Sequence, residues 1–163
     1  MLHDAPQFLV ALEQSGLGAA IRQSWWAYPA ANVGHILGLM LLAGAVAVMD
    51  ARMLGAFAAS PPASVVLPAR RVAIVSLLLM AATGFMLFTA EASHVALNRV
   101  FQVKATLIAL GVVNALLVAR ATGEALATTP AFTPLPGRVR TAAAVSLAIW
   151  LSVAACGRLI AYF

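Results

Sequence analysis

The sequence predicts an all-α integral membrane protein: a four-helix transmembrane bundle preceded by an N-terminal interfacial amphipathic helix. Two observations carry this prediction. The 163 residues are 63% hydrophobic and only 9% charged, whereas a soluble domain carries about a quarter charged residues. Four apolar stretches also reach the roughly 20 residues that a membrane-spanning helix needs. The composition therefore excludes a water-soluble monomer, and the high hydrophobicity excludes a disordered chain.

Residues 1–27 form the predicted interfacial helix. Phe8, Leu12, Ile21 and Trp25 recur near one helical face, and polar residues occupy other positions, as in helices that lie on a membrane surface. Acidic residues stand where a secretory signal would be basic, and no long apolar core follows, so a signal peptide is not indicated. The segment ends in aromatic residues of the kind that favour a membrane interface: Trp25, Trp26 and Tyr28.

Residues 28–163 form the predicted transmembrane domain, with spans at 28–49, 72–90, 101–119 and 141–163. Each span should be a helix, because lipid offers no hydrogen-bond partner to free backbone groups. The first span is predicted to stop at Asp50, the first formal charge after a long apolar run. Prolines punctuate the connections, and we expect Pro61, Pro62 and Pro68 to break the chain between the first two spans.

Basic residues predict the orientation of the bundle. The two loops on one side hold six arginines, Arg52, Arg70, Arg71, Arg120, Arg138 and Arg140, against four basic residues on the other side, Arg22, Arg99, Lys104 and Arg158. The positive-inside rule then makes the arginine loops cytoplasmic and points both termini outward. Because the basic residues stand at the ends of apolar runs, lipid headgroups rather than nucleic acid are their expected partners.

Ionisable residues converge on the outer half of the predicted bundle, and each is a functional candidate because charge is expensive in lipid. His35 lies roughly 10 Å deep at 1.5 Å per residue, and Asn32 lies one turn above it on the same face. The other spans bring further polar groups to this level: Glu91, His94, Lys104 and Arg158. Glu91, Lys104 and Arg158 are also close enough to span ends to reach headgroups or pair with one another. His35 is too short to do so, although a hydroxyl or carbonyl could satisfy it.

Several cofactors would suit a site centred on His35. As a metal ligand, His35 could bind haem b with Met86 or His94 as the second axial ligand, while Lys104 and Arg158 hold an anionic propionate. A quinone headgroup bonded by His35 and a cation is another interpretation. Copper(I) is a third, with thioethers from Met40, Met80 and Met86. Gly34 and Gly38 either allow close helix approach or clear space beside the histidine.

The sequence favours a protein without catalytic residues. It shows no Ser-His-Asp order, no paired carboxylates and no glycine-rich phosphate loop. The single cysteine, Cys156, excludes an internal disulfide and a cysteine-based metal centre.

Several phrases in the chain resemble a known family. They include His35–Leu39, Val48–Gly55, Thr83–Ala92, Asn98–Lys104, Asn114–Leu117 and Gly157–Phe163. Together they are similar to short bacterial four-helix inner-membrane proteins that form a domain family of unknown function. The resemblance implies a bacterial inner membrane and draws attention to His35, Glu91, Asn98, Lys104 and Arg158. Where similar sequences often place a histidine after Asn-Ala-Leu-Leu, this chain has Ala119 and Arg120. A looser likeness to small haem-b cytochromes and copper-resistance membrane proteins rests on fold alone.

Two functional hypotheses follow. The first is a small redox or ligand-binding membrane protein whose site is centred on His35, with Asn32 and Glu91 orienting the groups around it. The second is a non-catalytic accessory subunit that packs against a larger membrane complex or a second copy of itself, for which the small-residue faces would suit a partner helix.

Overall fold

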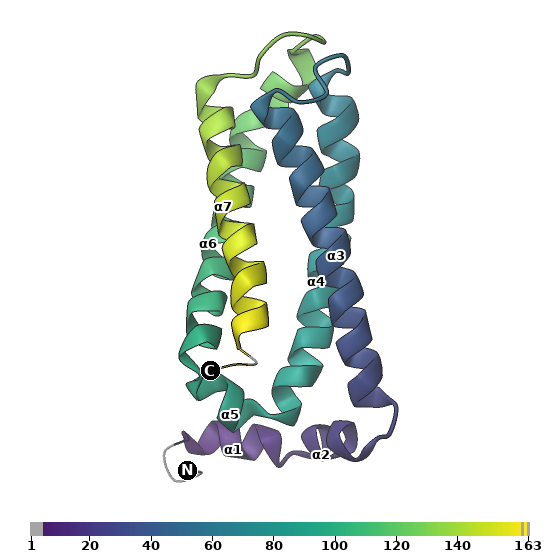
Figure 1. The fold of residues 1–163 in the computed structure, drawn as a ribbon, viewed down its shortest axis with the longest axis vertical. Coiled ribbons are helices and arrows are strands. Elements are labelled where there is room, and N and C mark those ends of the chain that lie inside the picture. The colour runs from purple at the N-terminus through teal and green to yellow at the C-terminus, as the bar shows by residue number, and fades with distance from the viewer. Residues whose placement is uncertain (1–4, 161, 163) are drawn as a thin grey trace.

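Long apolar runs with few helix-breaking residues fold here into long helices, and the computed structural model, which describes residues 5–160 and 162, confirms the all-α fold class (Figure 1). The helices in chain order are α1 (Gln7–Glu13), α2 (Gly16–Gln23), α3 (Ala27–Leu54), α4 (Pro62–Ala90), α5 (Ala92–Leu97), α6 (Arg99–Thr128) and α7 (Gly137–Leu159).

Four of these helices are long and apolar enough to cross a membrane: Ala27–Leu54, Pro62–Ala90, Arg99–Arg120 and Gly137–Leu159. At 1.5 Å per residue, α3 is about 42 Å long, close to the thickness of a bilayer with its headgroups. Large apolar side chains such as Met40, Val75 and Leu151 are exposed on the outside of the bundle. That surface suits lipid rather than water.

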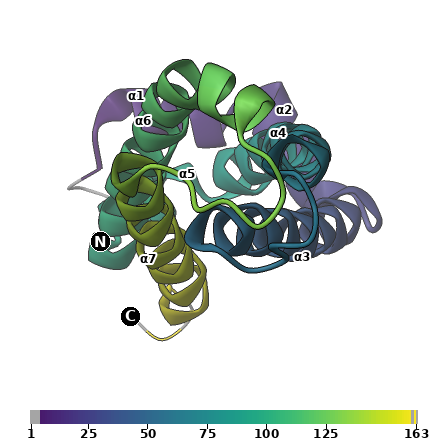
Figure 2. The same ribbon diagram turned by 90° about the horizontal axis from the view of Figure 1, so that it is seen from above.

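The four long helices form two antiparallel pairs. α3 packs along α4, α6 packs along α7, and α3 also contacts α7, whereas α4 touches α6 only lightly (Figures 1 and 2). A Cβ placed on Gly38 would lie 2.8 Å from Met80 Cγ, and one on Gly34 would lie 3.1 Å from Thr83 Cγ2. Side chains of α4 therefore fill the space beside both glycines, which fits the interpretation of close helix approach.

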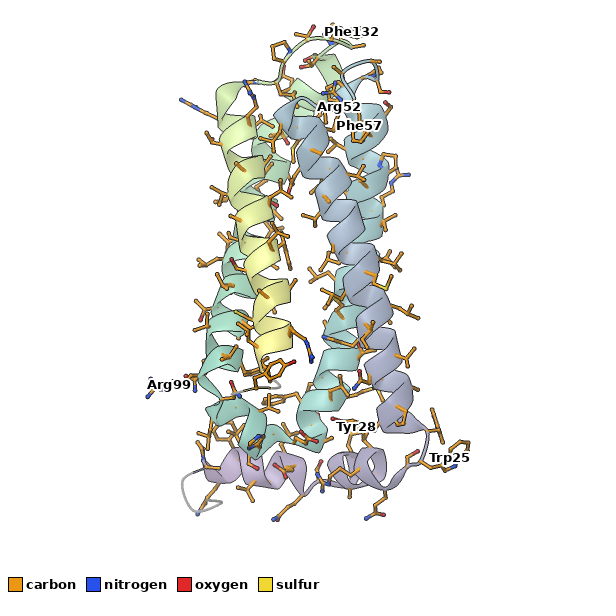
Figure 3. The ribbon with its side chains drawn as sticks, in the orientation of Figure 1. Trp25, Tyr28, Arg52, Phe57, Arg99 and Phe132 are labelled. Atoms are coloured by element: carbon orange, nitrogen blue, oxygen red, sulfur yellow. The ribbon has the colours of Figure 1, made fainter. Side chains whose placement is uncertain are left out.

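We call the end of the bundle that carries the α3–α4 and α6–α7 loops the loop end. An apolar cluster holds it together: Met53, Val66, Leu126, Leu135, Val139 and Ala143. The two loops meet where the backbone N–H of Phe132 donates to the Ala58 carbonyl at 2.7 Å. Phe57 and Phe132 have left-handed backbone angles, with φ of 53° and 60°, and both rings are exposed at this end (Figure 3).

We call the opposite end the terminal end, because α1 and α2 lie across it beside α5 (Figure 1). The predicted interfacial helix is thus two short helices, separated at Ser15, whose hydroxyl oxygen caps α2 by accepting from Gly18 N at 3.2 Å. Trp25 and Tyr28 stand at this end (Figure 3), so aromatic side chains occur at both ends of the bundle, as membrane proteins place them.

Two side chains tie α1 and α2 to the bundle. The Arg22 guanidinium donates to the carbonyls of Glu13 at 2.7 Å and Ala90 at 2.9 Å, which joins the C-terminal ends of α1 and α4. The Glu13 carboxylate accepts from the backbone N–H of Ser93 at 2.9 Å and from the Ser93 hydroxyl. The four helices α1, α2, α4 and α5 are therefore bonded to one another at the terminal end.

The helices extend beyond the apolar windows of the sequence. α3 continues to Leu54, four residues past Asp50, and α4 begins at Pro62, ten residues before the predicted start of the second span. Pro68, expected to break the chain, lies inside α4, where it removes one backbone hydrogen bond and crowds the carbonyl four residues earlier without ending the helix. The predicted end of the fourth span at Phe163 lies outside the described residues.

The Glu13 contact makes the docking of α1 dependent on pH. Hydrogen bonds from the Ser93 hydroxyl and backbone N–H, aided by the charge of Arg22, hold the pKa of Glu13 below its ordinary value of 4.5. A carboxylate with a lowered pKa contributes its full stabilisation at pH values above its ordinary pKa, and this contribution is lost as the pH falls through the lowered pKa.

We expect Glu13→Gln to lower thermal stability at neutral pH and to lessen the loss of stability below pH 4.5. Glu124→Gln, at an exposed position of α6, should change neither; equal pH profiles for wild type and Glu13→Gln would contradict the assignment.

Candidate functional site

A cavity of about 180 Å³ lies between the long helices in the half of the bundle nearer the terminal end. All four contribute to its lining, including His35 from α3, Met80 from α4, Lys104 from α6 and Trp150 from α7. The remaining lining residues are apolar. The structure thus brings the predicted pair His35 and Lys104 to one cavity. Met80, which the sequence analysis considers as a thioether ligand for copper(I), lines the same cavity.

Hydrogen bonds from α4 hold the His35 ring. The Thr83 hydroxyl donates to the Leu79 carbonyl at 2.8 Å and lies 3.0 Å from His35 Nδ1. The Met80 carbonyl is a further acceptor for a ring N–H. In the neutral tautomer that carries its proton on Nδ1, Nε2 keeps a lone pair. With the ring held in this way, the Nε2 lone pair can accept a hydrogen bond from a ligand or coordinate a metal ion.

Glycine makes room for the His35 ring on α4. A Cβ placed on Gly84 would lie 3.1 Å from His35 Cε1 and 3.5 Å from Nδ1. Contacts this close would push the ring away from Thr83, because the Gly84 backbone belongs to the long helix and cannot retreat. Gly84 is therefore a positioning residue for His35.

Lys104 supplies the cationic group of the cavity. Its side chain is half-buried and runs past Gly157 of α7, where a Cβ would lie 3.5 Å from Lys104 Nζ. No ion pair within the described part of the chain involves Lys104. A partly buried ammonium without an acidic partner favours a ligand with an oxygen acceptor.

The other predicted site residues lie outside the lining of this cavity. Asn32, Glu91, His94 and Arg158 are exposed, and Met86 is half-buried.

Three of the residues outside the cavity make local contacts. Glu91 accepts a long hydrogen bond of 3.4 Å from the Tyr28 hydroxyl. Arg158 donates to the Tyr162 hydroxyl at 2.5 Å and stacks on its ring. Asn98, singled out by the family resemblance, caps α6 by accepting from Val100 N and Phe101 N.

A second cavity of about 160 Å³ lies in the half of the bundle nearer the loop end. Its polar lining residues are Asp50 of α3, Arg70 of α4, Asn114 of α6 and Ser146 of α7. Trp150 lines both cavities and is packed against α6 at Gly111, where a Cβ would lie 3.1 Å from Trp150 Cζ2. Leu42, Val46 and Leu77 also line both cavities, so the two cavities adjoin each other.

Sequence reasoning missed Thr83, Trp150 and Asp50. Thr83 and Trp150 carry no signal in the sequence, because their role depends on how helices far apart in the chain rotate against each other. Asp50 does carry a signal, as a carboxylate adjoining an apolar run, but the same charge also predicts the end of a span. Within the described residues, no group of three or more histidine, cysteine, aspartate or glutamate residues could hold a metal ion.

The model of a family of unknown function, DUF6644, matches residues 14–163. No curated protein and no solved structure matches the chain.

Proposed function

The chain belongs to the family DUF6644, whose function is unknown, and from the chemistry of its own site we propose that this member binds a quinone-type redox ligand beside His35 and Lys104. A quinone is a small apolar ring with two polar oxygens. The cavity offers the matching arrangement, with apolar walls, a hydrogen-bond acceptor at His35 and a cationic donor at Lys104.

The observation that carries this proposal is that His35 and Lys104 line the same apolar cavity, and that no ion pair within the described residues neutralises Lys104. The hydroxyl of a quinol donates to Nε2, and the Lys104 ammonium donates to an oxygen of the ring. The volume also suits a single ring, because an apolar cavity of about 150 Å³ holds benzene.

Haem b has weaker support from this geometry. A free Nε2 suits an axial ligand, but neither Met86 nor His94 lines the cavity. Pockets for drug-sized ligands measure about 300 Å³ or more, and a haem is at least of that size. The spectrum of the purified protein still tests it directly.

The proposed setting is the bacterial inner membrane, as the family resemblance implies, with the terminal end outward. The excess of arginines at the loop end supports this orientation. The His35 cavity then lies in the outer half of the membrane. A reporter active only outside the cytoplasm, fused to the C-terminus, should be active; an inactive reporter on an inserted protein would reverse the orientation.

The test is a titration of the detergent-solubilised full chain with duroquinol. When it is oxidised to the quinone, its fully methylated ring has no unsubstituted position for addition of the Cys156 thiol. We expect His35→Ala to weaken binding by about tenfold or more, as loss of one hydrogen bond to a buried group does. Gly84→Ala should weaken binding several-fold while keeping the histidine, because it displaces the ring.

His94→Ala is the matched control, since it removes an exposed histidine that lies outside the cavity. Equal binding by His35→Ala and His94→Ala would overturn the quinone proposal. A haem α-band in protein from native membranes, lost in His35→Ala and kept in His94→Ala, would replace the quinone with haem. Co-purification with a larger complex, without binding of either ligand, would favour the accessory-subunit hypothesis.

A further inference from the structure

Asp50 is a fully buried carboxylate that pairs with no cation among the described residues. Its side chain is 0% exposed, and neither carboxylate oxygen has a partner at full hydrogen-bond geometry within the described part of the chain. The Ser146 hydroxyl of α7 is the neighbouring group that can donate to it. Burying an unpaired carboxylate costs several kcal/mol. Asp50 also lies fifteen residues from His35 on α3, roughly 22 Å along the helix axis, so it belongs to a different part of the bundle from the proposed quinone site.

The neighbouring basic residues do not compensate this charge. The buried Arg52 guanidinium donates to the Ser60 carbonyl through Nε at 3.1 Å and Nη2 at 2.8 Å. Arg70 lines the same cavity from α4, yet the described residues include no ion pair between it and Asp50. Asp50 therefore lines the cavity as a carboxylate that neither arginine pairs with among the described residues.

The rest of the lining indicates what kind of cation would pair with Asp50. Asn114 and Ser146 add polar groups from α6 and α7, and Trp150 adds an indole ring. The other walls are apolar, including Leu42, Val46 and Leu77. A hard inorganic cation prefers six or more oxygen ligands, which this lining does not offer. An ammonium on an apolar body suits it better, because carboxylates and indole faces both attract such cations.

We propose that the cavity at Asp50 is a binding site for a small organic cation, with the Asp50 carboxylate holding its ammonium group and Trp150 and the aliphatic residues holding its apolar body. Arg70 is the competing positive charge at this site. The volume of about 160 Å³ limits the ligand to about the size of a benzene ring with one short substituent.

The test is calorimetric titration of the full chain with benzylammonium, with benzyl alcohol as the uncharged probe of the same shape. We expect Asp50→Asn to weaken benzylammonium binding at least tenfold and to leave benzyl alcohol binding unchanged. Arg70→Gln should tighten benzylammonium binding several-fold because it removes a like charge. Arg71→Gln is the matched control, since Arg71 is exposed and does not line the cavity.

A second measurement, the infrared absorption of the Asp50 carboxyl group, tests the proposal in the wild-type protein and so does not depend on the folding of a variant. Infrared absorption of a protonated carboxyl group that disappears in Asp50→Asn, and that persists at saturating benzylammonium, would overturn the proposal. Equal benzylammonium affinity in wild type and Asp50→Asn would also overturn it. His35→Ala should leave benzylammonium binding unchanged, so failure at one site is distinguishable from failure at the other.

The same ammonium chemistry occurs in free amines and in the ethanolamine headgroup of lipids. Titration in phosphatidylcholine nanodiscs with and without phosphatidylethanolamine distinguishes these sources. If phosphatidylethanolamine lowers the apparent affinity for benzylammonium, the lipid headgroup is the ligand of this class; if it does not, the ligand is a free amine.

Discussion

Arg52→Ala should destabilise the protein by about 3 kcal/mol. The Arg52 side chain is only 2% exposed, and it is bonded twice to the Ser60 carbonyl in the loop between α3 and α4. Truncation removes both charge-assisted hydrogen bonds, leaves the carbonyl without a donor and opens space beside the apolar cluster at the loop end. Unfolding in a denaturing detergent series, followed by helical circular dichroism, measures the change.

Arg120→Ala is the control for this change, because Arg120 is an exposed arginine of α6 and should alter stability by less than about 0.5 kcal/mol. Arg52→Lys should fall between the two, since a lysine keeps the charge but cannot reproduce the two parallel bonds. If Arg52→Ala is as stable as Arg120→Ala, Arg52 does not hold the loop.

Gly18→Ala should detach α1 and α2 from the bundle, at a cost of about 2–3 kcal/mol. A Cβ at this position would lie 2.4 Å from the Glu13 carbonyl oxygen and 3.0 Å from that of Thr89. Both contacts are with backbone, so no side chain can rotate to relieve them. Hydrogen exchange of residues 7–23 measures the detachment, and it should rise sharply while the four long helices stay protected.

Gly16→Ala is the matched control, because a Cβ there meets nothing within 4 Å. It lies two residues away in the same helix, and alanine favours helix by up to about 1 kcal/mol, so protection of residues 7–23 should stay equal or increase. Similar exchange in the two variants would show that close packing at Gly18 does not hold α2 in place.

The fold could be predicted because membrane helices follow from composition and length, and each predicted span lies within or largely within one of the long helices. The helix ends could not be predicted, because a charged residue marks the limit of an apolar run but does not end a helix. α6 continues past Arg120 because the added turns bury Leu126 in the apolar cluster at the loop end, which stabilises them. α3 likewise passes Asp50 to bury Met53 in the same cluster.

The candidate site could be predicted only in its ionisable members. His35 was identifiable from its depth, because a histidine cannot reach the interface from there, and Lys104 from its place in the first turn of a span. Their shared cavity depends on how α6 rotates against α3. The contact between His35 Nδ1 and the Thr83 hydroxyl joins residues 48 positions apart in the chain, and no local pattern predicts such a pairing.

The pairing of α3 with α4 and of α6 with α7, with only light contact between α4 and α6, has a consequence for the order of assembly. Each pair is a helical hairpin that can insert and close by itself, and the two hairpins associate afterwards. His35 and Asp50 stand on the first hairpin, whereas Lys104, Asn114 and Trp150 stand on the second. Both cavities are therefore created only when the hairpins meet, so a ligand in either one bridges them and stabilises their association.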